Sequence, residues 1–213
     1  MLRILTAFLL VIPFLTACNR PQGLRVGQAF IPAKTLALAV QELRTTFPAQ
    51  GEATCRWILL QEGMGPAAIL HEQHPLQSAE AKKKAGALKG QLQQGTSMED
   101  LCILHGQNPE PLQKQPTPFG LGARVSAAVA DMEPGEWRGP FLTLAGWEFV
   151  ELIGRNPGLR SRSGVIVRTL VVAVGSYEDQ KDARALWKTL PLSGNADILR
   201  TFPPDFSHGR LPE

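Results

Sequence analysis

The sequence is poor in charge of either sign. Charged residues make up 19% of the 213 positions, and 22 Lys and Arg against 19 Asp and Glu leave a formal net charge of only +3. No dense cluster of Lys and Arg with interleaved aromatic residues is present, which argues against a nucleic-acid partner. The hydrophobic share of 44% is enough for a packed core and argues against a disordered chain. We therefore expect one or two small globular domains.

Cysteine is also scarce, and its spacing matches no redox or metal site. Cys55 and Cys102 have no CxxC partner. Cys102 lies in the apolar run Leu101–Leu104, which favours a small buried side chain over a disulfide, although an oxidising compartment would permit one. His71 and His74 are three residues apart, but no HExxH motif or third ligand accompanies them, so solvated loop histidines are favoured over a metal site. We expect no metal and no cofactor.

A long hydrophobic run is missing too. The apolar segment Ile4–Leu15 follows Arg3 and is too short to cross a bilayer. It leads into Leu-Thr-Ala-Cys, which ends at Cys18 and resembles the lipobox of bacterial lipoproteins, cleaved before the cysteine and lipidated on its sulfur. The alternative is an ordinary secretory peptide cleaved nearby. The resemblance implies a signal peptide over 1–17, a lipid anchor at Cys18 that holds the protein on the membrane, and, because Asn19 replaces the Asp that retains lipoproteins in the inner membrane, an outer-membrane location facing the periplasm.

Residues 18–50 predict a tether, a short strand and one helix. Pro32 suits the first helical turn, and apolar residues recur on one face up to Phe47, where Pro48 ends the helix. This pattern resembles the first strand and helix of periplasmic foldases of the SurA and PrsA kind. Only one helix fits before the next apolar segment, so the helical module of those proteins is expected here in reduced form.

The most informative stretch is Asp131–Arg155, which predicts a β-hairpin. Pro134-Gly135 ends the preceding apolar run, because neither residue continues a helix well. An apolar strand over Phe141–Leu144 is followed by a tight turn at Ala145-Gly146 and a second strand over Trp147–Ile153. Such a hairpin is not stable alone in water and needs a partner strand and a helical layer.

The letters of this stretch, MEPGEWRGPF and AGWEFVELIGR, resemble the end of the catalytic domain of parvulin-type peptidyl-prolyl isomerases, the rotamase family. Cys55–Gln61, CRWILLQ, is similar to the family's opening strand. The helix expected between Ser78, its predicted cap, and Gly95, together with a shorter helix over Met98–Gly106, resembles the family's helix pair. The resemblance implies an α+β fold over residues 51–156, in which a central antiparallel sheet is covered by helices and the opening strand lies beside the closing hairpin.

The resemblance also implies a site, and this chain departs from it. Parvulins are understood to use two facing histidines, an Asp or Cys beside them, and an apolar pocket for the proline ring. Trp57, Asn108 and Glu148 stand at the three polar positions, and none of these residues reproduces the hydrogen bonds of a histidine pair. The positions implied for substrate binding are Trp57, Leu121, Val125, Ala145, Trp147 and Glu148.

Two functions are compatible with these replacements. The first is a parvulin-like peptidyl-prolyl isomerase and foldase lipoprotein of the bacterial cell envelope, which assists the folding of exported proteins with weak or lost catalysis. The second is a non-catalytic lipoprotein that uses the same fold to hold extended polypeptide or to act as a scaffold. Both imply unfolded polypeptide clients, and whether the protein is an active enzyme stays open at this point.

Residues 157–213 predict a linker followed by a βα extension. VRTLVVA, Val167–Ala173, resembles the segment Cys55–Gln61, and the following stretch from Asp182 resembles the helix pair. The extension is therefore either the front half of a second parvulin unit or an unrelated βα tail. Thr169 stands where the opening strand of the family carries its histidine.

Overall fold

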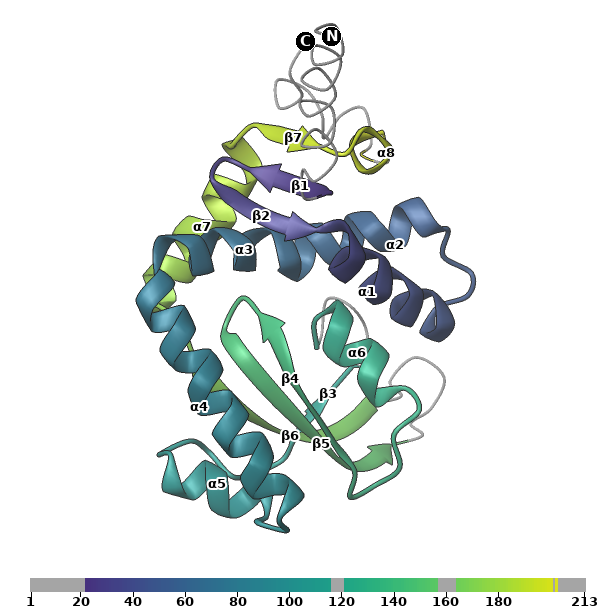
Figure 1. Cartoon of the computed structure of the whole chain (residues 1–213). Helices are drawn as coiled ribbons and strands as arrows, with labels where there is room; N and C mark the ends of the chain where they lie inside the picture. The colour runs from purple at the N-terminus through teal and green to yellow at the C-terminus, as the bar shows by residue number, and fades with distance from the viewer. Residues whose placement is uncertain (1–21, 116–120, 157–163, 201, 203–213) are drawn as a thin grey trace, which may run out of the picture.

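The computed structural model describes residues 22–115, 121–156, 164–200 and 202, and within them the fold is α+β with two antiparallel sheets (Figure 1). The first half of the molecule combines elements from both ends of the chain: β1 (Gly23–Val26), β2 (Ala29–Pro32), α1 (Ala33–Thr46), α2 (Glu52–Leu59), the π-helical turn η2 (Leu60–Met64), α3 (Gly65–Gln73), α7 (Tyr177–Thr189), β7 (Leu192–Gly194) and α8 (Ala196–Leu199). The second half is continuous in sequence: α4 (Pro75–Gln93), α5 (Met98–Leu104), β3 (Leu112–Lys114), α6 (Ala123–Val129), β4 (Trp137–Thr143), β5 (Gly146–Asn156) and β6 (Gly164–Ala173).

A three-stranded sheet, in the order β2-β1-β7, joins the two ends of the described chain in the first half. Leu24 of β1 is opposite Ile31 on one side and Gly194 on the other. The helices α3 and α7 pack together beneath this sheet, and Trp187 of α7 is almost fully buried. Its indole nitrogen donates to Gln61 Oε1 at 2.8 Å, so the turn η2 is fixed to α7 by both packing and a hydrogen bond.

The second half is built on a four-stranded sheet in the order β3-β6-β5-β4, with every neighbouring pair antiparallel. Successive residues of β5 face opposite sides of the sheet. Phe149 belongs to the apolar cluster under α4 and α5, whereas Val150 packs with Val125 and Val129 of α6. The sheet is therefore covered by helices on both faces, as its apolar residues require.

Polar contacts hold α5 and the segment after it against β6. Arg168 of β6 forms ion pairs with Glu151 of β5 at 2.6 Å and with Glu99 of α5 at 2.8 Å, and its Nε donates to the carbonyl of Pro109 at 2.6 Å. Gln107 makes two hydrogen bonds to the backbone of Val171. These contacts fix the edge of the sheet where the short strand β3 is added.

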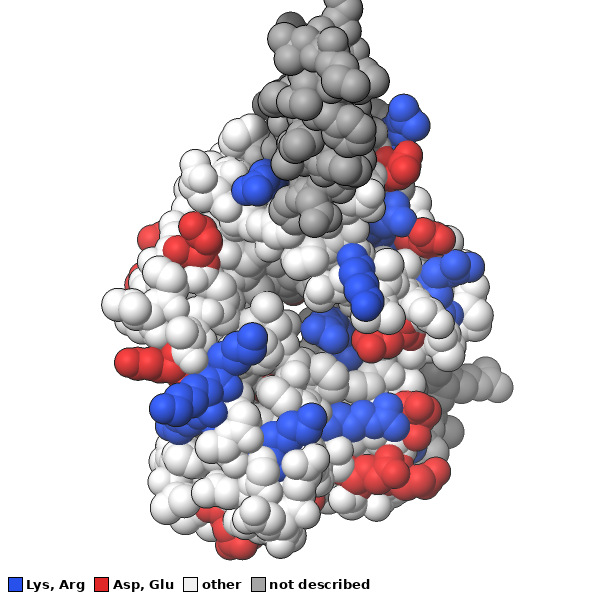
Figure 2. All heavy atoms as spheres, in the orientation of Figure 1, with Lys and Arg blue, Asp and Glu red and all other residues white. Residues whose placement is uncertain are grey.

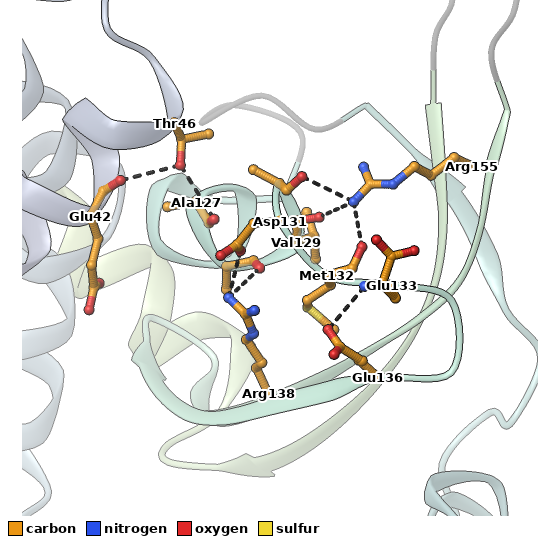
Figure 3. Close-up of polar contacts among 12 residues, drawn as sticks. Glu42, Thr46, Ala127, Val129, Asp131, Met132, Glu133, Glu136, Arg138 and Arg155 are labelled. Atoms are coloured by element: carbon orange, nitrogen blue, oxygen red, sulfur yellow. Dashed lines mark hydrogen bonds and ion pairs between the residues drawn. The ribbon is translucent and has the colours of Figure 1, made fainter.

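The two halves are connected at several points and share one core. The apolar cluster that contains Leu24 in the first half also contains Phe149 in the second. At the opposite side, α1 contacts α6, where Thr46 Oγ1 donates to the carbonyl of Ala127 at 3.4 Å (Figure 3). The halves are therefore two layers of one packed molecule, and Figure 1 shows α4 connecting them on one side and α1 beside α6 on the other.

The strand predicted for Cys55–Gln61 is wrong, because this segment forms α2 and part of η2. Cys55 and Leu59 are four residues apart and are both buried on the face that packs against α1, which is helical and not strand-like spacing. The position beside the closing hairpin is taken by β6, which pairs with β5 from Gly146↔Ala173 to Asn156↔Gly164.

Two further expectations are corrected. The loop predicted around His71 and His74 is the helix α3, which buries Ala67 and Leu70. The next helix, α4, begins at Pro75 and not after Ser78, because proline fits the first turn and Ser78 uses its side chain for another contact.

Other predicted elements are confirmed. They include the N-terminal helix, the end of α4 before Gly95 with its φ of 94°, the short helix α5, and the hairpin β4–β5. Cys55 and Cys102 are both buried and free. The predicted signal peptide, the predicted lipidation site Cys18 and the predicted linker over 157–163 lie outside the described residues. In the described ranges, no helix is both long and apolar enough to cross a membrane.

Candidate functional site

A cavity between the two halves contains four of the six residues expected to bind substrate. Leu121, Val125, Ala145 and Glu148 line it, and its volume is about 260 Å³. We call this cavity the inner chamber. The first half contributes part of its wall, from Leu59, Glu62, Gly63, Met64 and Arg184.

Trp147 is one residue away from Glu148 on β5 and lines a second cavity. This outer chamber has a volume of about 580 Å³ and lies between β2, α3, α4 and the hairpin. Met64, Arg124 and Leu142 line both chambers, which are therefore adjoining compartments of one cleft. Figure 2 shows the surface hollowed between the two halves, with Lys and Arg side chains around the hollow.

The two remaining expected residues lie elsewhere. Trp57 is on α2, packs partly against the main core and lines neither chamber. Asn108 is exposed in the segment between α5 and β3, where its Oδ1 accepts a hydrogen bond from the backbone amide of Glu110 at 3.0 Å. The structure therefore does not bring Trp57, Asn108 and Glu148 together as a polar trio. Trp57 is displaced because Cys55–Gln61 is helical, and Asn108 is displaced because the segment between α5 and β3 lies at the surface.

Glu148 is the acidic residue of the inner chamber whose pKa is shifted most. Burial raises the pKa of its carboxyl group to about 7, although a hydrogen bond with Thr143 and the charge of Lys114 act in the opposite direction. Near neutral pH a large share of Glu148 is therefore protonated. A protonated carboxyl group can donate a hydrogen bond to a carbonyl oxygen, which an ionised one cannot.

The remaining charges of the inner chamber are basic on two sides. Arg124, in the first turn of α6, has its Cζ 5.8 Å from the centre of the Phe141 ring and its Nη2 3.8 Å from Glu42 of α1. Arg184 reaches the chamber from α7. The described lining residues include no histidine, cysteine or lysine, so the chamber offers apolar contact and hydrogen bonds and lacks an evident nucleophile–base pair.

The helix α6 is held at its C-terminal end by two arginines (Figure 3). Arg138 Nη1 donates to the carbonyl of Ala128 at 3.0 Å and to Asp131 Oδ1 at 2.7 Å. Arg155 Nη2 donates to three carbonyls, those of Val129 at 2.7 Å, Ala130 at 3.1 Å and Met132 at 2.8 Å. Carbonyls at a helix C-terminus lack intrahelical partners and carry partial negative charge, so these contacts stabilise α6. Its first turn, which carries Arg124 and Val125, is thereby positioned in the cleft.

His71 and Arg124 are two cleft residues to which sequence analysis assigned no role in substrate binding. His71 is half-buried on α3, with Nδ1 2.5 Å from Ser78 Oγ and its ring edge-to-face with Trp147 at 6.2 Å between centroids. Burial lowers the pKa of His71, which keeps the ring neutral. The helical spacing of Ala67, Leu70 and His71 after Pro66 is the signal that could have placed this histidine on an inward face.

His71 and His74 do not form a common site. His74 Nε2 lies 3.6 Å from Asp179 of α7, whereas His71 faces Ser78 and Trp147. In the part of the chain that the structure describes, no group of three or more His, Cys, Asp or Glu side chains is arranged to hold a metal ion.

Comparisons of the chain with protein-family models, with curated proteins and with solved structures found no match. The resemblance to parvulins is therefore carried by the sequence motifs quoted above.

Proposed function

We propose that the protein is a parvulin-like foldase lipoprotein of the bacterial cell envelope, which holds extended, proline-containing segments of exported polypeptides in the cleft. One observation carries this proposal. Leu121, Val125, Ala145 and Glu148 occupy the positions that the resemblance assigns to substrate, and all four line the inner chamber. Leu121 and Val125 lie just before and within the first turn of α6, and Ala145 and Glu148 lie on the β4–β5 hairpin, so it is the packing of α6 against the hairpin that brings the two pairs together.

The arrangement of the second half supports the same proposal. The resemblance calls for an opening strand, two helices and a closing hairpin, with the opening strand beside the hairpin. Here α4 and α5 precede the hairpin β4–β5, and β6, which contains VRTLVVA, occupies the place beside it. We interpret this order as a circular rearrangement, in which the opening strand is supplied after the hairpin instead of before the helices.

Catalysis by this cleft is expected to be weak. Rotation about a peptide bond crosses a barrier of about 18–20 kcal/mol, and an isomerase lowers it by desolvating the twisting amide and by hydrogen bonding. The inner chamber offers apolar walls and a largely protonated Glu148, but no histidine pair. In β6, Thr169 stands at the position of the family's histidine and is opposite Val150 of β5. Loss of one acid–base contribution corresponds to about 10²–10⁴-fold in rate, so we expect turnover at least about a hundredfold below an intact parvulin.

The second candidate function is polypeptide binding without catalysis. The exposed position of Asn108, outside the cleft, favours this alternative, because the family's third polar group is then missing from the site. Both functions predict binding of the same clients, and only the rate of exchange distinguishes them.

The test uses the full mature chain and a labelled Xaa-Pro peptide, observed by exchange NMR. Leu121→Ala removes apolar contact from the inner chamber and should weaken peptide binding about tenfold, as expected for losing most of a leucine side chain. Leu112→Ala, at an exposed leucine of β3, is the matched control and should bind as the wild type does.

Four results are informative. Equal effects of the two leucine variants would place the client site outside the inner chamber and overturn the proposal. No binding of the peptide by the folded wild type would overturn it as well. A rate enhancement comparable to an intact parvulin would contradict weak catalysis. Binding with no measurable exchange would select the non-catalytic function.

A further inference from the structure

The outer chamber contains three shielded nitrogen atoms without a hydrogen-bond partner among the described residues. They are Trp147 Nε1, His71 Nε2 and Arg124 Nε, and all three side chains line the same cavity. Buried polar atoms in folded proteins are nearly always paired, because an unpaired one has lost its hydration without compensation. Three such atoms around one cavity indicate a group that the cavity is built to receive.

The chemistry of these atoms defines that group as a hydrogen-bond acceptor. Indole and guanidinium nitrogens can only donate. The hydroxyl of Ser78, 2.5 Å from Nδ1 of the neutral His71, can donate to that nitrogen, which leaves the hydrogen on Nε2 and makes it the third donor.

The charges around the outer chamber favour an anionic acceptor. Arg124 and Lys82 line it, against the single carboxylate of Glu72. Glu42 lies 3.8 Å from Arg124 Nη2 and is more than half exposed, so it neutralises the guanidinium only in part. A guanidinium that faces an apolar cavity binds a carboxylate more strongly than a neutral carbonyl.

Apart from Thr35, the rest of the chamber is apolar or aromatic. Its walls include Phe30, Pro32, Met64, Pro140 and Leu142. A space of about 580 Å³ with these walls accommodates an apolar side chain next to the acceptor group.

We propose that the outer chamber is a subsite for a peptide carboxylate, with Trp147, His71 and Arg124 as its donors and the neighbouring apolar residue of the peptide against the aromatic wall. The inference deepens the proposed function, on which it rests for the identity of the ligand as polypeptide. The three nitrogens are shielded from solvent. When the carboxylate enters, the side chains of Trp147, His71 and Arg124 rotate so that these nitrogens point into the chamber. The carboxylate belongs either to a free C-terminus or to an Asp or Glu side chain.

A small probe tests the subsite without any unfolded client. Uniformly ¹⁵N-labelled full-length mature protein is titrated with N-acetyl-phenylalanine and, in parallel, with N-acetyl-phenylalanine amide. The chain has four tryptophans, and Trp147→Phe assigns the indole signal of interest by its disappearance. We expect the acid to shift that signal and the amide to bind at least about tenfold more weakly, since the hydrogen bonds to a charged acceptor are lost.

Peptides then distinguish the two sources of the carboxylate. A short apolar peptide is compared as the free acid, as the C-terminal amide, and as an amide that carries one internal Asp. Preference for the free acid alone identifies a C-terminus, and restored binding by the internal Asp identifies a side chain.

Two variants test the donors. Trp147→Phe keeps an aromatic ring but removes the indole donor, and Arg124→Gln removes the charge; each should weaken binding of the acid several-fold and leave the amide nearly unchanged. Lys83→Gln is the matched control, because Lys83 is exposed on the same helix as Lys82 and does not line the chamber.

The outcomes separate this inference from the proposed function. Equal binding of acid and amide overturns the carboxylate subsite, even if long clients still depend on Leu121. If the protein binds N-acetyl-phenylalanine selectively but binds no long polypeptide, the carboxylate subsite is supported and the foldase proposal is refuted. Absence of any response of the Trp147 indole signal to the acid, in the folded wild-type protein, also overturns the inference.

Discussion

Glu148→Gln is expected to remove a pH-dependent part of the free energy of unfolding. In the folded protein, burial raises the pKa of Glu148 from its ordinary value of 4.5 to about 7. Between these two values the folded chain holds a proton that the unfolded chain has released, so unfolding becomes easier as the pH rises. The contribution of Glu148 is therefore fully favourable below 4.5 and is lost as the pH rises through about 7.

The size of this effect follows from the same two values. One pKa unit corresponds to about 1.4 kcal/mol, so the ionised carboxylate destabilises the fold by up to about 3 kcal/mol above neutral pH, and by less where solvent screens it. Glutamine cannot ionise and keeps nearly the same shape. Near pH 8 the variant should thus be more stable than the wild type, whereas near pH 4.5 the two should be similar.

Urea unfolding of both proteins, followed by circular dichroism from about pH 4.5 to about pH 8, measures the difference. The lowered pKa of His71 acts with the opposite sign, because a folded state that binds fewer protons becomes more stable as pH rises, and this term cancels in the comparison. Glu80→Gln, at an exposed position of α4, controls for the change in net charge. If the curves of wild type and Glu148→Gln run parallel over the whole range, the carboxyl group is not buried in the manner described.

Arg168→Ala should lower the free energy of unfolding by about 3 kcal/mol, because it leaves the carboxylates of Glu99 and Glu151 without a counter-charge. Lys181→Ala, which removes one partner of an exposed ion pair, should lower it by less than about 0.5 kcal/mol in the same urea assay. Equal losses would contradict the assigned network. Gly65→Ala should sharply lower the thermal midpoint, since its Cβ would overlap the indole ring of Trp187 in α7. Gly86→Ala, with open space around it, should be neutral or stabilising. A tolerated alanine at Gly65 would show that α7 can move away. When cells are grown with radioactive fatty acid, the Cys18→Ala variant should incorporate no label. Unchanged incorporation would exclude a lipid anchor at this residue.

The hairpin and the helices with clear local signals could be predicted from sequence. Ala145-Gly146 defines the turn of β4–β5, and apolar alternation defines the strands beside it. Ser97 caps α5 by accepting a hydrogen bond from the amide of Asp100, and Ser176 and Asp179 cap α7 reciprocally. In each case the information lies within a few residues of the element it determines.

For Cys55–Gln61, the local sequence is not enough to predict the secondary structure. A short apolar run fits a buried strand or a buried helix equally well, and only its neighbours decide between them. Here α1 offers a helical groove, while the free edge of β5 is satisfied by the much longer β6. The same limit applies to the site. Leu121, Val125, Ala145 and Glu148 line one cavity, but their role in binding stays a prediction. The position of Trp57 depended on the misassigned strand. Arg124 and His71 acquire their surroundings only from tertiary packing.

The pairing of β1 with β7 has a consequence for the order of events during folding. Leu24 is opposite Gly194, so the sheet of the first half cannot be completed until residue 194 has been made. The second half, from α4 to β6, is contiguous and depends on contacts of shorter range, which form sooner because less chain entropy is lost in closing them. In a chain synthesised from its N-terminus, the second half would therefore form first, and the sheet of the first half would be completed only when β7 has been made.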